Sequence, residues 1–254
     1  MEQTQPTNCN CGCQNRKGGA GVAVILGVSL ILSAALIGFV LYTTRSMDDS
    51  LQVTGSAKKT ITSDVVKWNS EFSRNVGVDG LKTGYTQMSS DLEKVKSFLK
   101  DNGIEEKDIT TSPVYLNQQY DYSKGGSSLT GYTLRQNIQI QSTDVQKITD
   151  LAKNTQKLIE DGVIFSTQSL EYYYTKLPET RVDLLADAVK DAQNRAGKIA
   201  GSSGQNVGSL KSASVGVVQV LPVNSVEISD YGAYDTSSIE KEVMITVRAV
   251  FRLK

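Results

Sequence analysis

The chain has 254 residues and a balanced charge, with 27 Lys and Arg side chains against 27 Asp and Glu. This length, with 39% hydrophobic residues, is enough for a folded domain with a real core. The charge balance gives no electrostatic basis for binding nucleic acid. Histidine is absent, which excludes Ser-His and Cys-His catalytic pairs and histidine metal sites.

No enzyme motif takes the place of the missing histidine. Two Ser-x-x-Lys matches occur, at residues 56–59 and 97–100, but neither has the S-D-N and K-T-G companions that make the pattern informative. Acidic pairs fall in linkers and at predicted helix ends, where carboxylates usually cap helices or face solvent. We therefore expect a non-enzymatic protein with no cofactor and no small-molecule substrate.

An apolar stretch near the N-terminus predicts a membrane-spanning helix. No residue from 18 to 44 is charged, and residues 22–42 would span about 31 Å as a helix, close to the thickness of a hydrocarbon core. The apolar part of a secretory signal is shorter, about 7–15 residues, so we expect an uncleaved signal anchor. A cleavage site at Ser33-Ala34-Ala35 is the alternative.

Basic residues around this helix predict its orientation. Arg16 and Lys17 precede it and Arg45 follows it, so the positive-inside rule places the N-terminus in the cytoplasm. The predicted organisation is a cytoplasmic tail (1–17), a signal anchor (18–44), a linker (45–50) and an exported domain (51–254). The exported part carries no cysteine, which suits an oxidising compartment.

The tail holds all three cysteines of the chain, Cys9, Cys11 and Cys13, in the stretch CNCGC. They precede the apolar stretch, whereas a lipoprotein cysteine would follow it. Three thiolates are one short of a closed structural zinc site. One tail could hold copper(I), or several tails could share zinc, and we take these cysteines as metal-ligand candidates. The alternative is an unstructured, reduced tail.

The exported part alternates between strand and helix periodicity. After a strand at 51–61, residues 62–176 follow the order β-α-β-β-α-β, which predicts an α+β fold of ferredoxin-like type, with two helices on one face of an antiparallel sheet. The predicted elements are strands near 66–76, 111–122, 129–142 and 163–176, and helices over 81–99 and 144–159.

A third helix and C-terminal strands complete a single domain with an extension. The helix is expected to begin after Pro178 and to end at 201–204, followed by strands at 211–220 and 242–253. The loop 221–238 between them is long enough to suggest a contact surface or disorder. Tyr231 and Tyr234 in this loop, with Tyr172 and Tyr174 in a strand, are candidate oligomer contacts, although packing within a sheet explains strand tyrosines equally well.

Four stretches of the exported part resemble the SIMPL-domain family, which includes YggE-like proteins. They are LQVTGSAKKTITSDVVKWNSEFS, DITTSPVYLNQQYDYSKGGSSLTGYTLRQNIQIQSTDVQKI, TRVDLLADAVKDAQNRAGKIAGSSGQNVGSL and EVMITVRAVFRL. The most specific pieces are V-T-G-S, D-I-T-T-S with the following Y-x-Y and G-Y, and the third helix, rich in Asp and Ala. The chain departs from the family in its long anchor behind a cysteine-bearing tail and in lacking Pro-Gly before the last strand.

The resemblance implies a bacterial envelope protein with no catalytic residues to carry over. It also implies a link to oxidative or envelope stress protection and assembly into homo-oligomers. We therefore expect a non-enzymatic, single-pass protein of the bacterial cell membrane that works through homo-oligomerisation. The alternative is a transmembrane sensor or adaptor that couples the exported domain to the CNCGC tail.

Overall fold

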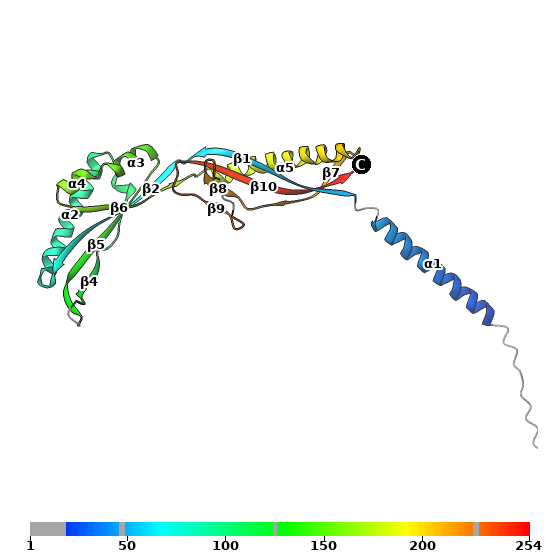
Figure 1. Ribbon diagram of the computed structural model, residues 1–254, viewed down its shortest axis with the longest axis horizontal. Coiled ribbons are helices and arrows are strands. Elements are labelled where there is room, and N and C mark those ends of the chain that lie inside the picture. Colours follow the sequence, from blue (N-terminus) through cyan, green and yellow to red (C-terminus); the bar gives the residue numbers. More distant parts are fainter. Residues whose placement is uncertain (1–18, 46–48, 124–125, 226–228) are drawn as a thin grey trace, which may run out of the picture.

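The computed structural model describes residues 19–45, 49–123, 126–225 and 229–254. Within these ranges, the helix α1 (Gly19–Arg45) is followed by two lobes that each combine a β-sheet with helices (Figure 1). The fold is therefore mixed α+β, as expected. The buried apolar residues form two separate clusters, one in each lobe.

Helix α1 has the length and composition of a membrane span. Its segment Val24–Tyr42 has a mean hydropathy of 2.7, and no part of it is buried by the rest of the chain. A signal anchor and a signal peptide both fit an apolar helix at this position.

The first lobe is built on the long strand β10, which pairs with β1 along one edge and with β8 and β7 along the other. Helix α5 lies against the sheet (Figure 1) and buries alanines against alternate residues of β10, such as Val243 and Val247. Its elements are β1 (Ser50–Thr62), α5 (Leu177–Ser202), β7 (Val207–Val215), β8 (Gln219–Pro222), β9 (Ala233–Tyr234) and β10 (Glu240–Leu253).

The second lobe is an antiparallel sheet with the strand order β3-β5-β2-β6, and β4 extends the β3 side by pairing with β5. Helices α2, α3 and α4 cover one face of it, where Trp68, Phe72, Leu134 and Ile138 are buried. Its elements are β2 (Val65–Gly77), η1 (Val78–Gly80), α2 (Leu81–Asp101), η2 (Glu106–Asp108), β3 (Ile109–Thr111), β4 (Tyr115–Asp121), β5 (Ser128–Ser142), α3 (Val145–Lys153), α4 (Gln156–Glu160) and β6 (Ile164–Tyr173).

Side-chain contacts explain how the helices of the second lobe are placed. Asp144 caps α3, as the sequence predicts, and accepts a hydrogen bond from the Lys147 main-chain N–H at 3.1 Å. The guanidinium of Arg74 in β2 donates two hydrogen bonds, from Nε and Nη2, to the buried carboxylate of Asp91 in α2. The same group donates to the Gly162 carbonyl oxygen at 2.8 Å, which fixes the turn before β6.

Three predicted elements are each divided in two. The strand expected at 111–122 is interrupted at Pro113, which has no N–H to donate to a ladder. The strand expected at 211–220 breaks at Gly216, where a Cβ would lie 2.4 Å from the Thr246 hydroxyl oxygen. The helix expected at 144–159 is divided at 154–155 into α3 and α4. Helix α5 begins at Leu177, one residue before Pro178 rather than after it.

Candidate functional site

The second sheet has an open face on the side away from its helices. Even-numbered residues of β2 from Val66 to Phe72 are buried, so the odd-numbered residues of that strand point to the open side. The same alternation holds in β5, where Leu134, Ile138 and Ile140 are buried. The open face is therefore polar. Its side chains on β2 and β5 are Lys67, Asn69, Glu71, Ser73, Asn75, Thr133, Arg135, Asn137, Gln139 and Gln141.

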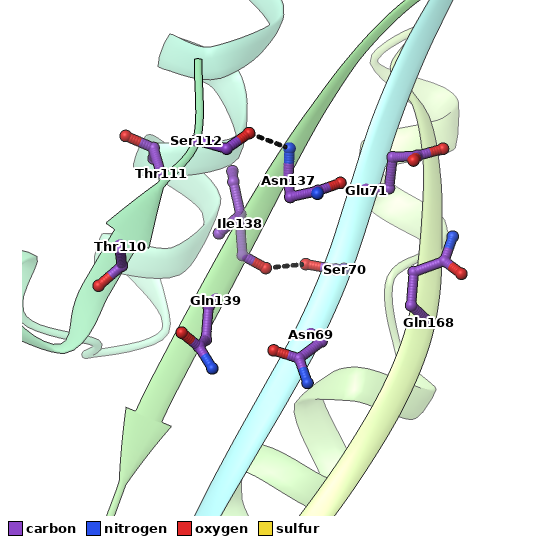
Figure 2. Close-up of a pocket in the computed structure, with 10 residues that line it drawn as sticks. All are labelled: Asn69, Ser70, Glu71, Thr110, Thr111, Ser112, Asn137, Ile138, Gln139 and Gln168. Atoms are coloured by element: carbon purple, nitrogen blue, oxygen red, sulfur yellow. Dashed lines mark hydrogen bonds between the residues drawn. The ribbon is translucent and has the colours of Figure 1, made fainter. Parts of the chain in front are cut away.

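A shallow hollow of about 480 Å³ lies on this face. Figure 2 shows that β5 and β2 form its floor, with β3 along one side and β6 along the other. Its lining is almost entirely amide, hydroxyl and backbone, with Glu71 as the one carboxylate. The lining residues are Asn69, Ser70, Glu71, Thr110, Thr111, Ser112, Asn137, Ile138, Gln139 and Gln168.

Two local irregularities shape the walls of the hollow. On the β3 side, the Ser112 hydroxyl accepts a hydrogen bond from the Asn137 main-chain N–H at 2.9 Å (Figure 2), and the Ser112 N–H donates to the Asn137 carbonyl oxygen. On the β6 side, Asn69 pairs with Ser169 and Ser70 pairs with Thr167, which leaves Gln168 as a bulge residue. A bulge of this kind changes the direction of a side chain relative to the regular alternation along the strand.

A hydrogen-bonded network continues the open face toward the first lobe. The Asn69 amide donates to the Ser169 hydroxyl at 2.9 Å and to Glu171 Oε1 at 3.1 Å, and the Tyr173 hydroxyl donates to Glu171 Oε2 at 2.7 Å. The bond from Tyr173 is the main cause that lowers the pKa of Glu171. The same bond raises the pKa of Tyr173 to about 12. Glu171 is therefore a carboxylate and Tyr173 a neutral phenol at neutral pH.

Charges on the open face occur in opposite pairs. Arg135 Nη1 lies 3.7 Å from Glu71 Oε1, and Lys67 contributes to the lowered pKa of Glu171. The Lys67 ammonium also lies 4.9 Å from the centroid of the Tyr173 ring. The face thus has strong hydrogen-bonding capacity and little net charge. Within the described residues, no group of three or more Asp, Glu, His or Cys side chains is arranged to hold a metal ion.

The tyrosines singled out from the sequence lie in different environments. Tyr231 is 97% exposed, and Tyr234 is 38% exposed and stacks on Tyr173 with ring centroids 6.1 Å apart. The Tyr234 hydroxyl accepts the Tyr174 main-chain N–H at 3.0 Å, and the half-buried Tyr174 contacts the Thr180 hydroxyl. Tyr172 is a core residue, with its hydroxyl 3.0 Å from that of Thr149, so its side chain is not available as a surface contact.

The structure does not test the cysteine prediction, and the sequence analysis did not predict the amide-rich face. Cys9, Cys11 and Cys13 lie outside the described residues, so the metal-site prediction remains a prediction. Conversely, sequence reasoning did not single out Asn137, Gln139 or Gln168. A signal was present in RQNIQIQS (135–142), where an amide occupies nearly every position opposite the apolar face.

Comparison with known proteins agrees with the resemblance in the sequence. The family model described as "SIMPL: Protein of unknown function (DUF541)" matches residues 51–251. The chain belongs to the SIMPL family. The curated "Uncharacterized protein YggE" of Edwardsiella ictaluri (strain 93-146) is 25% identical to this SIMPL protein over 152 residues. That match covers 59% of this chain and 62% of the relative, so the chain spans about three fifths of the relative's length.

Structure gives physical roles to the motifs that carry the resemblance. Gly55 of V-T-G-S lies where β1 meets helix α5, and its main chain approaches Ala188 and Ala192 closely. Thr110, Thr111 and Ser112 of D-I-T-T-S form the β3 wall of the hollow. The first motif therefore serves packing, whereas the second lies at the candidate site.

Proposed function

We propose that this SIMPL protein is a non-enzymatic, membrane-anchored envelope protein that acts through homo-oligomerisation. The observation that carries the proposal is an arm formed by β4 and the adjoining part of β5. Every residue of β4 is exposed, and the arm carries Tyr115, Leu116, Tyr120 and Tyr122 outside both hydrophobic cores. Aromatic side chains are enriched at protein interfaces, so a second copy is the occupant proposed for this arm.

The anchor and the domain architecture support this proposal. Helix α1 would hold the chain in a bacterial membrane with the N-terminus in the cytoplasm and the two lobes outside, as the flanking basic residues predict. We also interpret the second lobe as ferredoxin-like, supported by its antiparallel strand order β6-β2-β5-β3. Association in the plane of the membrane would raise the local concentration of the arms.

Light scattering on the full chain in detergent tests self-association. We expect a molar mass that is a multiple of the protomer, and we expect the triple variant Leu116→Ser, Tyr120→Ser, Tyr122→Ser to shift toward the monomer. The matched control replaces exposed apolar residues elsewhere, as Tyr85→Ser, Val182→Ser and Ile199→Ser. A wild-type protein that stays monomeric at high concentration would contradict the proposal.

The physiological part of the proposal is protection against oxidative or envelope stress. It rests on what the resemblance to the SIMPL family implies, since the matching family model and the YggE relative carry no described function. A deletion strain should be more sensitive to peroxide, and the wild-type gene should restore resistance where the arm variant does not. Equal sensitivity of the deletion and parent strains would remove this role. Turnover in a broad screen of hydrolase substrates would contradict the non-enzymatic assignment.

A transmembrane sensor or adaptor is the second candidate function. The observation that favours it is that all three cysteines precede α1, whereas the folded lobes follow it. Replacing Cys9, Cys11 and Cys13 with Ser should then abolish the stress response without changing the oligomeric state. A membrane-impermeant maleimide applied to intact cells tests the topology, because cytoplasmic thiols should react only after lysis. Labelling of intact cells would place the tail outside.

A further inference from the structure

We propose that the hollow on the open face of the second sheet binds an extended, uncharged glycan chain. The inference is independent of self-association through the arm. It rests on the chemistry of the lining, the balance of charge and the pairing of the two strands beneath the hollow.

The lining presents unused hydrogen-bonding groups. The side-chain amides of Asn137, Gln139 and Gln168 make no hydrogen bond to another residue in the part of the chain that the structure describes, and Figure 2 shows them around one hollow. Each amide offers two donors and an acceptor. Sugar hydroxyl groups also donate and accept, so amides can match them without a change in protonation. Thr110 and Thr111 add hydroxyls on the β3 side.

Charge balance argues against an anionic ligand. Arg135 lies beside Glu71 on this face, and Lys67 lies near Glu171. A polyanion such as a nucleic acid or a phosphate-bearing polymer is normally bound by an excess of Lys and Arg. The paired charges here favour a neutral polar ligand over either sign.

Backbone pairing and the scarcity of aliphatic side chains argue against two other kinds of occupant. Strands β2 and β5 are paired on both sides beneath the hollow, so a peptide has no free strand edge to extend there. Only Ile138 in the lining is aliphatic, and its side chain is 1% exposed. A lipid or other apolar ligand would therefore find no wall of aliphatic side chains.

The polar surface is longer than one sugar ring requires. Open-face side chains of β5 continue from Thr133 to Gln141, a span of about 27 Å at the usual rise of a strand. Because each exposed hydrogen bond replaces one to water, its net contribution is small, about 1 kcal/mol. Useful affinity at a shallow site therefore requires several sugars in contact at once, which favours a chain over a monosaccharide.

Isothermal titration calorimetry on the full chain tests this site. The detergent is zwitterionic and has no sugar headgroup, so that it cannot compete. The probes are the neutral oligosaccharides chitotetraose and cellotetraose, with a heparin tetrasaccharide as the anionic comparison. We expect saturable binding of a neutral tetrasaccharide. The variant Asn137→Leu, Gln139→Met, Gln168→Met keeps side-chain size but loses the amides, and it should bind about tenfold more weakly or worse.

A matched variant separates the site from a general surface effect. Gln52→Met, Gln193→Met, Asn194→Leu replaces three exposed amides elsewhere and should bind like the wild type. Thermal unfolding of both variants checks that each is folded. Absence of binding by both neutral sugars, equal binding by the site variant, or binding of heparin alone would overturn the proposal. Loss of self-association in the site variant, with no sugar bound by the wild type, would make this face a contact between copies and would also overturn it.

Discussion

Lys241 places a fully buried ammonium group at the start of β10. Its Nζ donates to the main-chain oxygen of Asp235 and lies 3.4 Å from Asp235 Oδ2, and its side chain is 0% exposed. Burial lowers the pKa of Lys241 against the opposing attraction of Asp235. Burial also acts to raise the pKa of Asp235, but hydrogen bonds from Ser238 and Ser237 and the charge of Lys241 hold it well below its usual range.

We predict that removing Asp235 lowers the free energy of unfolding more than removing Lys241 does. Asp235→Ala leaves a buried ammonium without its carboxylate and should reduce the free energy of unfolding by about 3 kcal/mol. Lys241→Met leaves the Asp235 carboxylate 10% exposed and still hydrogen-bonded to Ser237 and Ser238, so it should cost less. The double variant should be more stable than Asp235→Ala alone. Urea denaturation measures all three. Strictly additive effects would contradict the coupling.

Asp235 also gives the pair a defined pH dependence. The pKa of Asp235 is lower in the folded protein than in the unfolded chain, where it is about 4. The stabilisation by Asp235 is therefore complete above about pH 4 and is lost as the pH falls below about 4. The difference in unfolding free energy between wild type and Asp235→Ala should therefore shrink in acid.

Tyr173 should give the opposite pH dependence at the alkaline end. Its pKa rises from 10.0 to about 12 in the folded protein, because the hydroxyl donates to Glu171 and ionisation would place two negative charges together. The stabilisation of the fold by Tyr173 is therefore complete below pH 10 and is lost as the pH rises toward 12. The pKa of Glu171 is lowered in the folded protein, so the stabilisation by its carboxylate is lost as the pH falls through the acid range.

We predict that Tyr173→Phe lowers the melting temperature most between about pH 5 and pH 10. The difference from wild type should narrow on both sides of that window, as measured by thermal unfolding across pH. Tyr85→Phe is the control, because Tyr85 is an exposed tyrosine on α2 whose hydroxyl makes no hydrogen bond to another described residue. A difference for Tyr173→Phe that stays constant with pH would contradict the assignment.

Among the elements, helix α5 and strand β1 approach each other closely. Four alanines one turn apart, Ala188, Ala192, Ala196 and Ala200, are buried on α5, and a Cβ on Gly55 would lie 2.2 Å from the Ala188 oxygen. The Ser56 N–H donates to the Asp191 carboxylate at 2.9 Å, which satisfies a donor on the free edge of β1. The motif V-T-G-S and the Ala-rich helix are therefore two sides of one interface.

We predict that Gly55→Ala destabilises the first lobe by several kcal/mol. The added methyl meets main-chain atoms of α5, which cannot move aside as the end of a flexible side chain could. Gly77→Ala is the matched control: no atom lies within 4 Å of a Cβ there, and φ is −68°, which any residue adopts. That control should be neutral or stabilising by under about 1 kcal/mol. Equal effects of the two substitutions in urea denaturation would refute the close-packing argument.

Element types could be predicted from the sequence because they follow local periodicity. The amphipathic spacing of α2 and the alternation in β2 are visible residue by residue, and the Asp144 cap is a local signal. The break at Pro113 has a local signal, whereas the break at Gly216 depends on a tertiary contact, because Thr246 on another strand leaves room only for a small residue. The hollow was not predictable for a related reason: Ser112, Asn137 and Gln168 come together only through sheet pairing and a bulge.

At the scale of the whole molecule, two hydrophobic cores are joined by hydrogen bonds, an aromatic stack and the partly buried Ile239, which packs against the core of the second lobe. The Asp64 carboxylate accepts the Thr175 N–H at 2.8 Å and its hydroxyl at 2.7 Å, which ties the β1–β2 bend to the chain between β6 and α5. The Ser63 N–H donates to the Ile239 oxygen at 2.9 Å. Tyr234 stacks on Tyr173 from the loop before β10. No hydrophobic cluster within the described residues combines buried side chains of both lobes.

We predict that weakening this junction separates the unfolding of the two lobes. Asp64→Ala with Tyr234→Ala removes polar and stacking contacts between them but leaves both cores intact, so differential scanning calorimetry of the full chain should show two transitions where the wild type shows more cooperative unfolding. Asp187→Ala with Tyr85→Ala removes the same residue types from exposed positions on α5 and α2 and should keep the wild-type profile. A single transition in the junction variant, with calorimetric and van't Hoff enthalpies equal, would show that coupling does not depend on these contacts. Two transitions in the junction variant would mean that each lobe unfolds as a unit of its own once these contacts are lost.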